Sequence, residues 1–213
     1  FTLAVLGVRT ARKAVTEKVV LHLKDKATDT AEIINGRVTA FFQFLEGIAR
    51  MPILTDENLS YSEKAAILDK EVVFNERLEE LNLYDISEIS TANDDQFTSL
   101  KNSTWFKSAA KGKRFASEPI LSRSLHKLVF VFAVPVYDKD KNVVAVLNCT
   151  IKAEHLSNDI DDIIVGETGD CYILSRSGTT IAHKNFDMVS SQNNVLNDAK
   201  TNKEFASLAK FTQ

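Results

Sequence analysis

The sequence predicts an α+β fold in which a long N-terminal helix packs on an antiparallel sheet. Apolar residues recur at helical spacing through residues 9–51. Two runs rich in Val, Leu, Ile and Phe, Leu128–Val136 and Val143–Ile151, flank a polar six-residue turn, which is typical of a β-hairpin. A second and shorter pair of such runs lies within residues 170–183, so we expect a second sheet to begin there.

The long helix is predicted from apolar positions three and four residues apart, which place one apolar stripe along it. These positions are Val20, Leu23, Ala27, Ala31, Ile34, Val38, Phe41, Leu45 and Ile48. Pro52 ends the pattern. At 1.5 Å per residue the helix would be roughly 60 Å long, so its stripe either packs along a sheet or pairs with another helix. Residues 1–8 (FTLAVLGV) are either the start of this helix or the outer end of a transmembrane helix.

The middle of the chain predicts a helix, a strand and a loop in succession. The helix is expected over Tyr61–Leu83 and the strand over Leu83–Thr91, where β-forming residues alternate. Residues 92–104 are polar and predict a loop, followed by a short helical turn at Trp105 and Phe106. The Asn-Asp-Asp cluster in that loop lacks the spacing of a calcium loop, so we interpret it as a solvated turn.

Beyond the hairpin, Lys152–Ile163 has the pattern of a short amphipathic helix. Asp170–Leu174 and Thr179–His183 then predict two strands joined by a turn that contains Gly178. A polar helical stretch follows to Gln213. Since one hairpin cannot complete a sheet domain, we expect the chain to be part of a longer protein.

Composition and motifs exclude several classes of function. The chain carries 26 basic and 29 acidic residues, and this balance gives no electrostatic basis for binding nucleic acid. The two cysteines, Cys149 and Cys171, match no zinc or redox spacing, and we expect both to be buried and inert. The four histidines fall in separate predicted elements, and they are His22, His126, His155 and His183. No nucleophile elbow or phosphate-binding loop is present, so we expect no enzyme activity, metal or cofactor.

A binding pocket is the remaining interpretation, and it depends on three residues. Asn148 and Thr150 share one face of the strand Val143–Ile151 and are its polar residues, and buried polar groups require partners. Their partner is either a ligand or water and neighbouring loops. Trp105, the single tryptophan, either stacks on a small ligand or closes the core.

The hairpin determines what surrounds these residues. If it is symmetric about its turn, Val131 and Ala133 lie next to Asn148 and Thr150, while Phe130 and Phe132 face the long helix. A slip of one residue would reverse the two faces.

The segments WFKSA-KGK-F-SEP and AVPVYDKDKNVVAVL, in this order and spacing, resemble the ligand-binding module of double Cache sensor domains. These are PAS-like domains on the outside of bacterial chemoreceptors and sensor kinases. The resemblance covers roughly residues 10–190. It implies that 52–160 form a membrane-distal Cache module and that 161–213 form the incomplete beginning of a membrane-proximal one. Residues 9–51 are then the long helix behind these modules, and residues 1–8 are a candidate end of a membrane span.

The resemblance also implies a site. Many amino-acid-binding members carry an Arg two residues before the Trp, a Tyr after the Glu-Pro, and an Asp near the end of the second hairpin strand. The matching positions here are Ser103, Ile120 and Thr150. A zwitterion buried without charged partners would lose much of its solvation energy, so we expect a neutral or less charged ligand instead of a typical α-amino acid. The candidate ligand-binding residues are Ser103, Trp105, Ile120, Ser122, Val131, Asn148 and Thr150.

The function implied is that of an extracytoplasmic small-molecule-sensing domain of a transmembrane signal transducer, with a chemoreceptor ahead of a sensor kinase or a cyclic-dinucleotide enzyme. The long helix would support a homodimer, and flanking helices would anchor the protein in the cell membrane. The alternative is a ligand-free dimerisation or interaction module that senses through a partner protein. A hydrolase is a weaker alternative, because no nucleophile–base pair was found.

Overall fold

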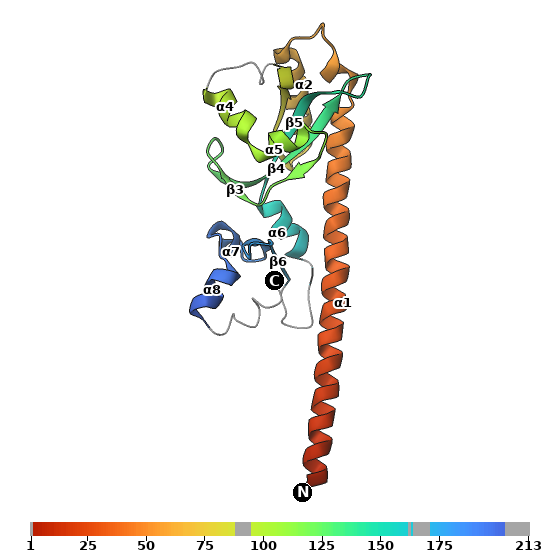
Figure 1. Cartoon of the computed structure of the whole chain (residues 1–213), viewed down its shortest axis with the longest axis vertical. Coiled ribbons are helices and arrows are strands. Elements are labelled where there is room, and N and C mark those ends of the chain that lie inside the picture. The colour runs from red at the N-terminus through yellow and green to blue at the C-terminus, as the bar shows by residue number, and fades with distance from the viewer. Residues whose placement is uncertain (1, 88–94, 162, 164–170, 203–213) are drawn as a thin grey trace.

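The computed structural model of the chain describes residues 2–87, 95–161, 163 and 171–202 (Figure 1). A single long helix runs beside a sheet domain and a smaller C-terminal unit. Its helices are α1 (Thr2–Ala49), the 3-10 turn η1 (Pro52–Thr55), α2 (Tyr61–Phe74), α4 (Asp95–Asn102), α5 (Thr104–Ala109), α6 (Glu154–Asp161), α7 (Asp187–Ser190) and α8 (Val195–Thr201). Its strands are β1 (Leu78–Asp85), β2 (Phe115–Ala116), β3 (Ile120–Ser122), β4 (Lys127–Tyr137), β5 (Val143–Lys152), β6 (Tyr172–Leu174) and β7 (Thr180–His183).

Helix α1 confirms the predicted long helix, but only its C-terminal part is buried in the sheet domain. Every side chain from residue 5 to residue 29 is exposed, and the N-terminal end of the helix extends well beyond the rest of the chain (Figure 1). Burial begins near Val38, and Phe42, Leu45 and Ile48 belong to the main core. Within the described residues, no helix combines the length and the apolarity that crossing a bilayer requires.

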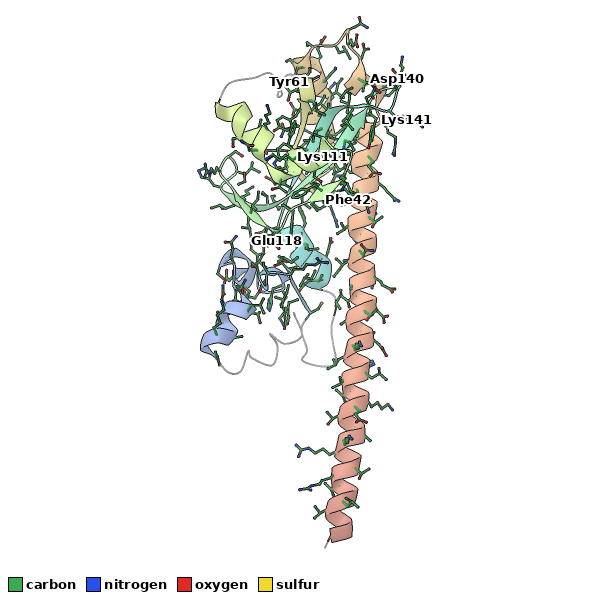
Figure 2. All side chains as sticks on the ribbon, in the orientation of Figure 1. Phe42, Tyr61, Lys111, Glu118, Asp140 and Lys141 are labelled. Atoms are coloured by element: carbon green, nitrogen blue, oxygen red, sulfur yellow. The ribbon has the colours of Figure 1, made fainter. Side chains whose placement is uncertain are left out.

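The main sheet is antiparallel, with the strand order β1-β5-β4-β2, and β3 also pairs with β4. The central hairpin β4–β5 is the predicted one, and its register confirms the expected neighbours: Val131 lies opposite Thr150, and Ala133 lies opposite Asn148. The carboxylate of Asp138 closes the turn by accepting hydrogen bonds from the backbone N–H groups of Asp140 and Asn142. Asp140 and its neighbour Lys141 form the tip of this hairpin (Figure 2).

One face of the sheet packs against α1 and α2 and forms the main core. Phe130 and Phe132 face α1, as the alternation predicted. The Phe132 ring meets Phe41 and Phe42 of α1 edge to face, with centroid distances of 4.8 and 5.3 Å. Leu147 of β5 is fully buried in the same layer. Edge-to-face pairs of this kind hold α1 to the sheet beyond the contribution of buried area alone.

The prediction of a helix over Tyr61–Leu83 was wrong in its second half. Helix α2 has the capping box of Ser60 and Glu63 and ends at Phe74, and the chain then enters β1 at Leu78. Leu78, Leu81 and Leu83 are buried on the α1 side as strand residues, whereas Phe74 is 84% exposed. The apolar spacing of this stretch fits a helix and a strand, and pairing with β5 decides between them.

The following segments differ from the prediction in extent. The strand predicted to reach Thr91 ends at Asp85, and residues 88–94, with Asn93 and Asp94 of the acidic cluster, lie outside the described residues. The predicted loop contains helix α4, which begins at Asp95. Helix α5 confirms the short helical turn at Trp105 and Phe106.

The C-terminal unit contains the predicted second hairpin, β6–β7. Gly178 in its turn has a φ of +83°, and a Cβ there would lie 2.5 Å from Leu196 Cγ, so glycine is required. The helix before this unit, α6, is shorter than Lys152–Ile163, and the last helix described is α8. Residues 203–213, predicted to be helical, lie outside the described part of the chain.

A cavity of about 210 Å³ lies where α1, α6 and the main sheet meet the C-terminal unit. His155 lines it, and the ring Nε2 of His155 is the one fully enclosed side-chain nitrogen or oxygen without a hydrogen-bond partner among the described residues. Burial lowers the pKa of His155, and the charges of Arg77 and Lys152 lower it further, against the opposing effects of Asp159 and Glu154.

We therefore expect stability to fall as the pH decreases through 6.5, the ordinary pKa of His155. The folded state holds this ring neutral, so below that pH the unfolded chain binds the proton more readily. Urea unfolding at about pH 7.5 and about pH 5.5 measures the loss of free energy of unfolding. His155→Phe should reduce the difference between the free energies of unfolding measured at these two pH values. The exposed-site control His22→Gln should leave that difference unchanged. An equal pH dependence in all three proteins would contradict this assignment.

Candidate ligand-binding site

The sheet face that points away from α1 carries the candidate site, and we call it the Asn148 face. Its side chains come from three neighbouring strands and are Glu80, Asn82, Tyr84, Val131, Ala133, Val146, Asn148 and Thr150. Asn82 of β1 and Ala133 of β4 lie on either side of Asn148 in register. Glu80 and Val131 lie on either side of Thr150 in the same way. Polar groups from β1 and β5 therefore gather at the middle of this face.

Asn148 and Thr150 are each only 5% exposed, yet neither side chain has a hydrogen-bond partner among the described residues. His155 Nε2 is the one polar side-chain atom in the described part of the chain that is both fully enclosed and without a partner. The unpartnered polar atoms of Asn148 and Thr150 therefore keep a small contact with solvent. Buried polar groups that lack partners are costly unless something else supplies the hydrogen bonds. The two side chains are thus free to bind a small molecule that reaches this face.

Trp105 forms an aromatic wall at one end of the Asn148 face. Its ring lies 5.3 Å from the ring of Tyr84 and 5.9 Å from that of Phe106, measured between centroids. Phe106 is buried against Ala133 and Val146 in a second, smaller core cluster, which fixes α5 on the sheet. Trp105 itself is only partly buried, so part of its ring remains free for a ligand.

The side chains of Ser103 and Ser122 form hydrogen bonds with nearby backbone groups. The Ser103 hydroxyl caps α5: it accepts a hydrogen bond from Phe106 N–H and donates one to Leu100 C=O at 2.7 Å. Ser122 is the last residue of β3, and its Oγ accepts a hydrogen bond from the backbone N–H of Leu125 in the turn that follows. Ile120 is 45% exposed on β3, at the edge of the sheet. Of the seven predicted site residues, the structure brings together Trp105, Val131, Asn148 and Thr150.

Three residues of the Asn148 face were missed: Glu80, Asn82 and Tyr84. They lie in the segment that the sequence assigned to the second helix and the first residues of a strand. The signal was the alternation in LEELNLYD, where the leucines Leu81 and Leu83 point to the core and the polar residues point away.

The electrostatics of this face are uneven. Burial raises the pKa of Tyr84 to about 12, with smaller contributions from Tyr61 and Glu80, so its hydroxyl is neutral and able to donate at physiological pH. Burial also raises the pKa of Glu79, but hydrogen bonds and charge from Lys152 and Lys127 outweigh it and leave that pKa lowered. The Glu79 carboxylate lies 3.0 Å from Lys152 Nζ and 3.4 Å from Lys127 Nζ.

Reactive and metal-binding chemistry finds little support in the described residues. No group of three His, Cys, Asp or Glu side chains within them is placed to hold a metal ion. Cys149 is buried on the α1 side of the sheet, and burial raises the pKa of its thiol. Cys171 is partly exposed, so the expectation that both cysteines are buried was wrong for this residue.

Larger hollows lie elsewhere among the described residues. One, of about 590 Å³, lies between α1 and β6, and its lining is mostly apolar. Another of about 520 Å³ lies at the end of β1 near the hairpin turn. Neither includes Trp105, Asn148 or Thr150. Size alone favours these hollows, but the Asn148 face combines buried polar groups without partners and an aromatic wall, which is the composition of a small-molecule site.

The long helix behind an antiparallel sheet is the arrangement of a PAS-like module. The family model of the Cache domain matches residues 8–209, and the chain belongs to the double Cache domain family. The comparison with curated protein sequences found no match.

Solved structures of sensor domains share this fold. One is the ligand-binding domain of the Pseudomonas aeruginosa PAO1 amino acid chemoreceptor PctC in complex with GABA, with a TM-score of 0.64, 15% identity, and coverage of 83% of this chain and 80% of that one. Another is the sensory domain of the Campylobacter jejuni chemoreceptor Tlp3 with isoleucine bound, with a TM-score of 0.54, 21% identity and coverage of 82% and 74%. A third is the extracellular domain of mmHK1S-Z3, assigned as a histidine kinase, with a TM-score of 0.59, 12% identity and coverage of 82% and 74%.

Proposed function

We propose that this chain is the extracytoplasmic sensor region of a transmembrane signal transducer and binds a small molecule on the Asn148 face. The observation that carries the proposal is the pair Asn148 and Thr150, both buried and both without a hydrogen-bond partner among the described residues. The neighbouring structures with GABA and isoleucine, and the chemoreceptors they come from, support the class of function. A chemoreceptor is our first choice for the whole protein, and a sensor kinase is the second.

The proposed signal passes through the sheet to α1. Along β5, Asn148 faces the ligand side, and its neighbours Leu147 and Cys149 face the core that contains α1. A ligand that draws the β1 and β5 side chains together would favour one packing of Phe132 against α1 over another. This is a population shift between two arrangements of the helix, driven by the difference in ligand affinity between them.

We further propose that α1 supports a homodimer and leads towards the membrane through helices outside this sequence. The exposed first half of α1 carries the large apolar residues Val5, Leu6, Val8, Val15, Val19, Val20, Leu21 and Leu23. An exposed apolar surface of this length marks an interaction site. Sedimentation equilibrium of the purified chain measures this association, and a monomer at every concentration would exclude it.

The ligand proposed here lacks the paired charges of an α-amino acid. None of the side chains that make up the Asn148 face is an arginine or a lysine, and Lys127 and Lys152 of β4 and β5 are paired with Glu79. A neutral or singly charged small molecule avoids the cost of burying an unpaired carboxylate.

Thermal unfolding of the purified chain with amino acids, amines, purines, sugars and organic acids tests the proposal. A ligand that binds only the folded state raises the melting temperature with dose. Trp105→Ala should weaken binding about tenfold or more, because it removes the aromatic wall. Phe74→Ala, which removes an exposed aromatic residue at the end of α2, should bind as the wild type does. If nothing binds to a folded dimer, the ligand-free interaction module becomes the better explanation.

A further inference from the structure

Two adjacent glutamates of β1 have very different surroundings. Glu79 pairs with both Lys127 and Lys152. Glu80 has no ion pair and no hydrogen bond to its carboxylate among the described residues, although it is partly buried. A partly buried carboxylate without a cation is unfavourable unless a cation reaches it.

The register of β1 on β5 determines which glutamate faces the site, and a β-bulge lies directly beside that glutamate. Leu78 pairs with Ile151, and Glu80 pairs with Thr150, so β1 advances two residues while β5 advances one. Glu79 is the additional residue and leaves Leu78 on the α1 side, whereas the regular pairing from Glu80 onwards places Glu80 in line with Asn82 and Tyr84 on the Asn148 face. Bulges often redirect a side chain next to a binding site. Glu80 is close enough to Tyr84 for its charge to contribute to the raised pKa of that hydroxyl.

The groups around Glu80 also suit a cation. The Tyr84 and Trp105 rings lie 5.3 Å apart, and an ammonium ion is attracted to the faces of such rings. The oxygens of Asn82, Asn148 and Thr150 can accept hydrogen bonds from its N–H groups. The sequence from Leu81 to Leu100 contains no lysine or arginine, so this part of the chain supplies no competing cation.

We propose that the Asn148 face binds an organic amine that carries no carboxylate, with Glu80 as the counter-ion of its ammonium group. The inference rests on the proposed function of this face and specifies its ligand class. Glu80 attracts the ammonium group, the aromatic pair contacts the adjacent carbon atoms, and Asn148 and Thr150 accept hydrogen bonds. An α-amino acid would bring its carboxylate towards Glu80 without a cation to offset the repulsion, which gives discrimination against it.

The test compares amines with the amino acids that differ from them by one carboxylate. Suitable pairs are isoamylamine with leucine, 2-phenylethylamine with phenylalanine, and putrescine with ornithine. Calorimetric titration and thermal unfolding of the purified chain should show binding by at least one amine, and at least about tenfold weaker binding by its amino acid.

Two glutamate variants identify the counter-ion. Glu80→Gln should weaken amine binding about tenfold or more, since a charge-assisted hydrogen bond is lost. Glu76→Gln makes the same chemical change at an exposed position just before β1 and should leave binding unchanged. Circular dichroism and the melting temperature without ligand confirm that both variants fold.

The outcomes separate the two proposals. The chain could instead bind α-amino acids or neutral compounds and lose that binding in Trp105→Ala. This result would support the location of the ligand site and overturn the amine inference. Amine binding that is unaffected by Glu80→Gln would overturn the role of Glu80. If no compound binds to the folded wild-type chain, Trp105→Ala has no binding to reduce, and both proposals fail.

Discussion

Replacing Leu45 with alanine should lower the free energy of unfolding by about 2–5 kcal/mol. Leu45 is fully buried where α1 packs on the sheet, in the same cluster as Phe132 and Leu147. Truncation removes buried methyl groups and leaves a cavity that the rigid β4–β5 hairpin cannot close. Because this layer joins the sheet to the helix, the variant should also weaken the coupling that we propose between the ligand site and α1.

Leu21→Ala provides the matched control, since it makes the same change on the same helix. Leu21 is 60% exposed, so its truncation should change the free energy of unfolding of a monomer by less than about 0.5 kcal/mol. Urea unfolding at low protein concentration measures both variants. Equal destabilisation by the two would show that the first half of α1 is buried in solution, as in a dimer. Little effect from Leu45→Ala would contradict the packing of α1 on the sheet.

The central hairpin could be predicted in detail because two signals agree there. The alternation of β5 and the polar turn at Asp138 specify one register, and that register places Asn148 and Thr150 together beside Val131. The turn is also locally stable, because the Asp138 side chain binds the backbone of the turn itself. Local chemistry and tertiary packing therefore favour the same structure.

Strand β1 could not be predicted because its local signals conflict. Leu78 and Leu81 continue the helical spacing of α2, and the bulge at Glu79 interrupts the simple alternation of a strand. Only pairing with β5, a strand at least sixty residues further along the chain, decides that this segment is a strand. Because β1 was not predicted, two residues of the candidate site, Glu80 and Asn82, were not predicted either.

The sequence also did not show how much of α1 packs against the sheet. Its apolar stripe looks the same at Val20 as at Phe41, but the sheet reaches only the second of these. Ser103 shows the same limit at the site: a serine next to Trp105 can face a ligand or cap a helix, and the choice depends on where α5 begins. Sequence patterns indicate which face is apolar, whereas the partner of that face is set by the fold.

Asn148→Leu should stabilise the protein and abolish its response to ligand. Asn148 is only 5% exposed and its amide has no hydrogen-bond partner among the described residues, so an apolar side chain of similar size removes an uncompensated polar group. The expected gain in the free energy of unfolding is about 1 kcal/mol, because the unfavourable burial is lost and the core position is kept filled. A binding site commonly gives up stability in this way in order to present polar groups to its ligand.

Urea unfolding and ligand-induced thermal shifts of the same protein preparation measure the two effects of Asn148→Leu together. Asn158→Leu, on the exposed side of α6, makes the same substitution away from the site and should leave the thermal shift unchanged. A purely structural role predicts the opposite result, since replacing an asparagine that the fold requires would destabilise the protein. A variant that is less stable than the wild type yet still responds to ligand would therefore remove Asn148 from the site. A gain in stability with loss of the response would show that the sheet carries this polar side chain for its ligand.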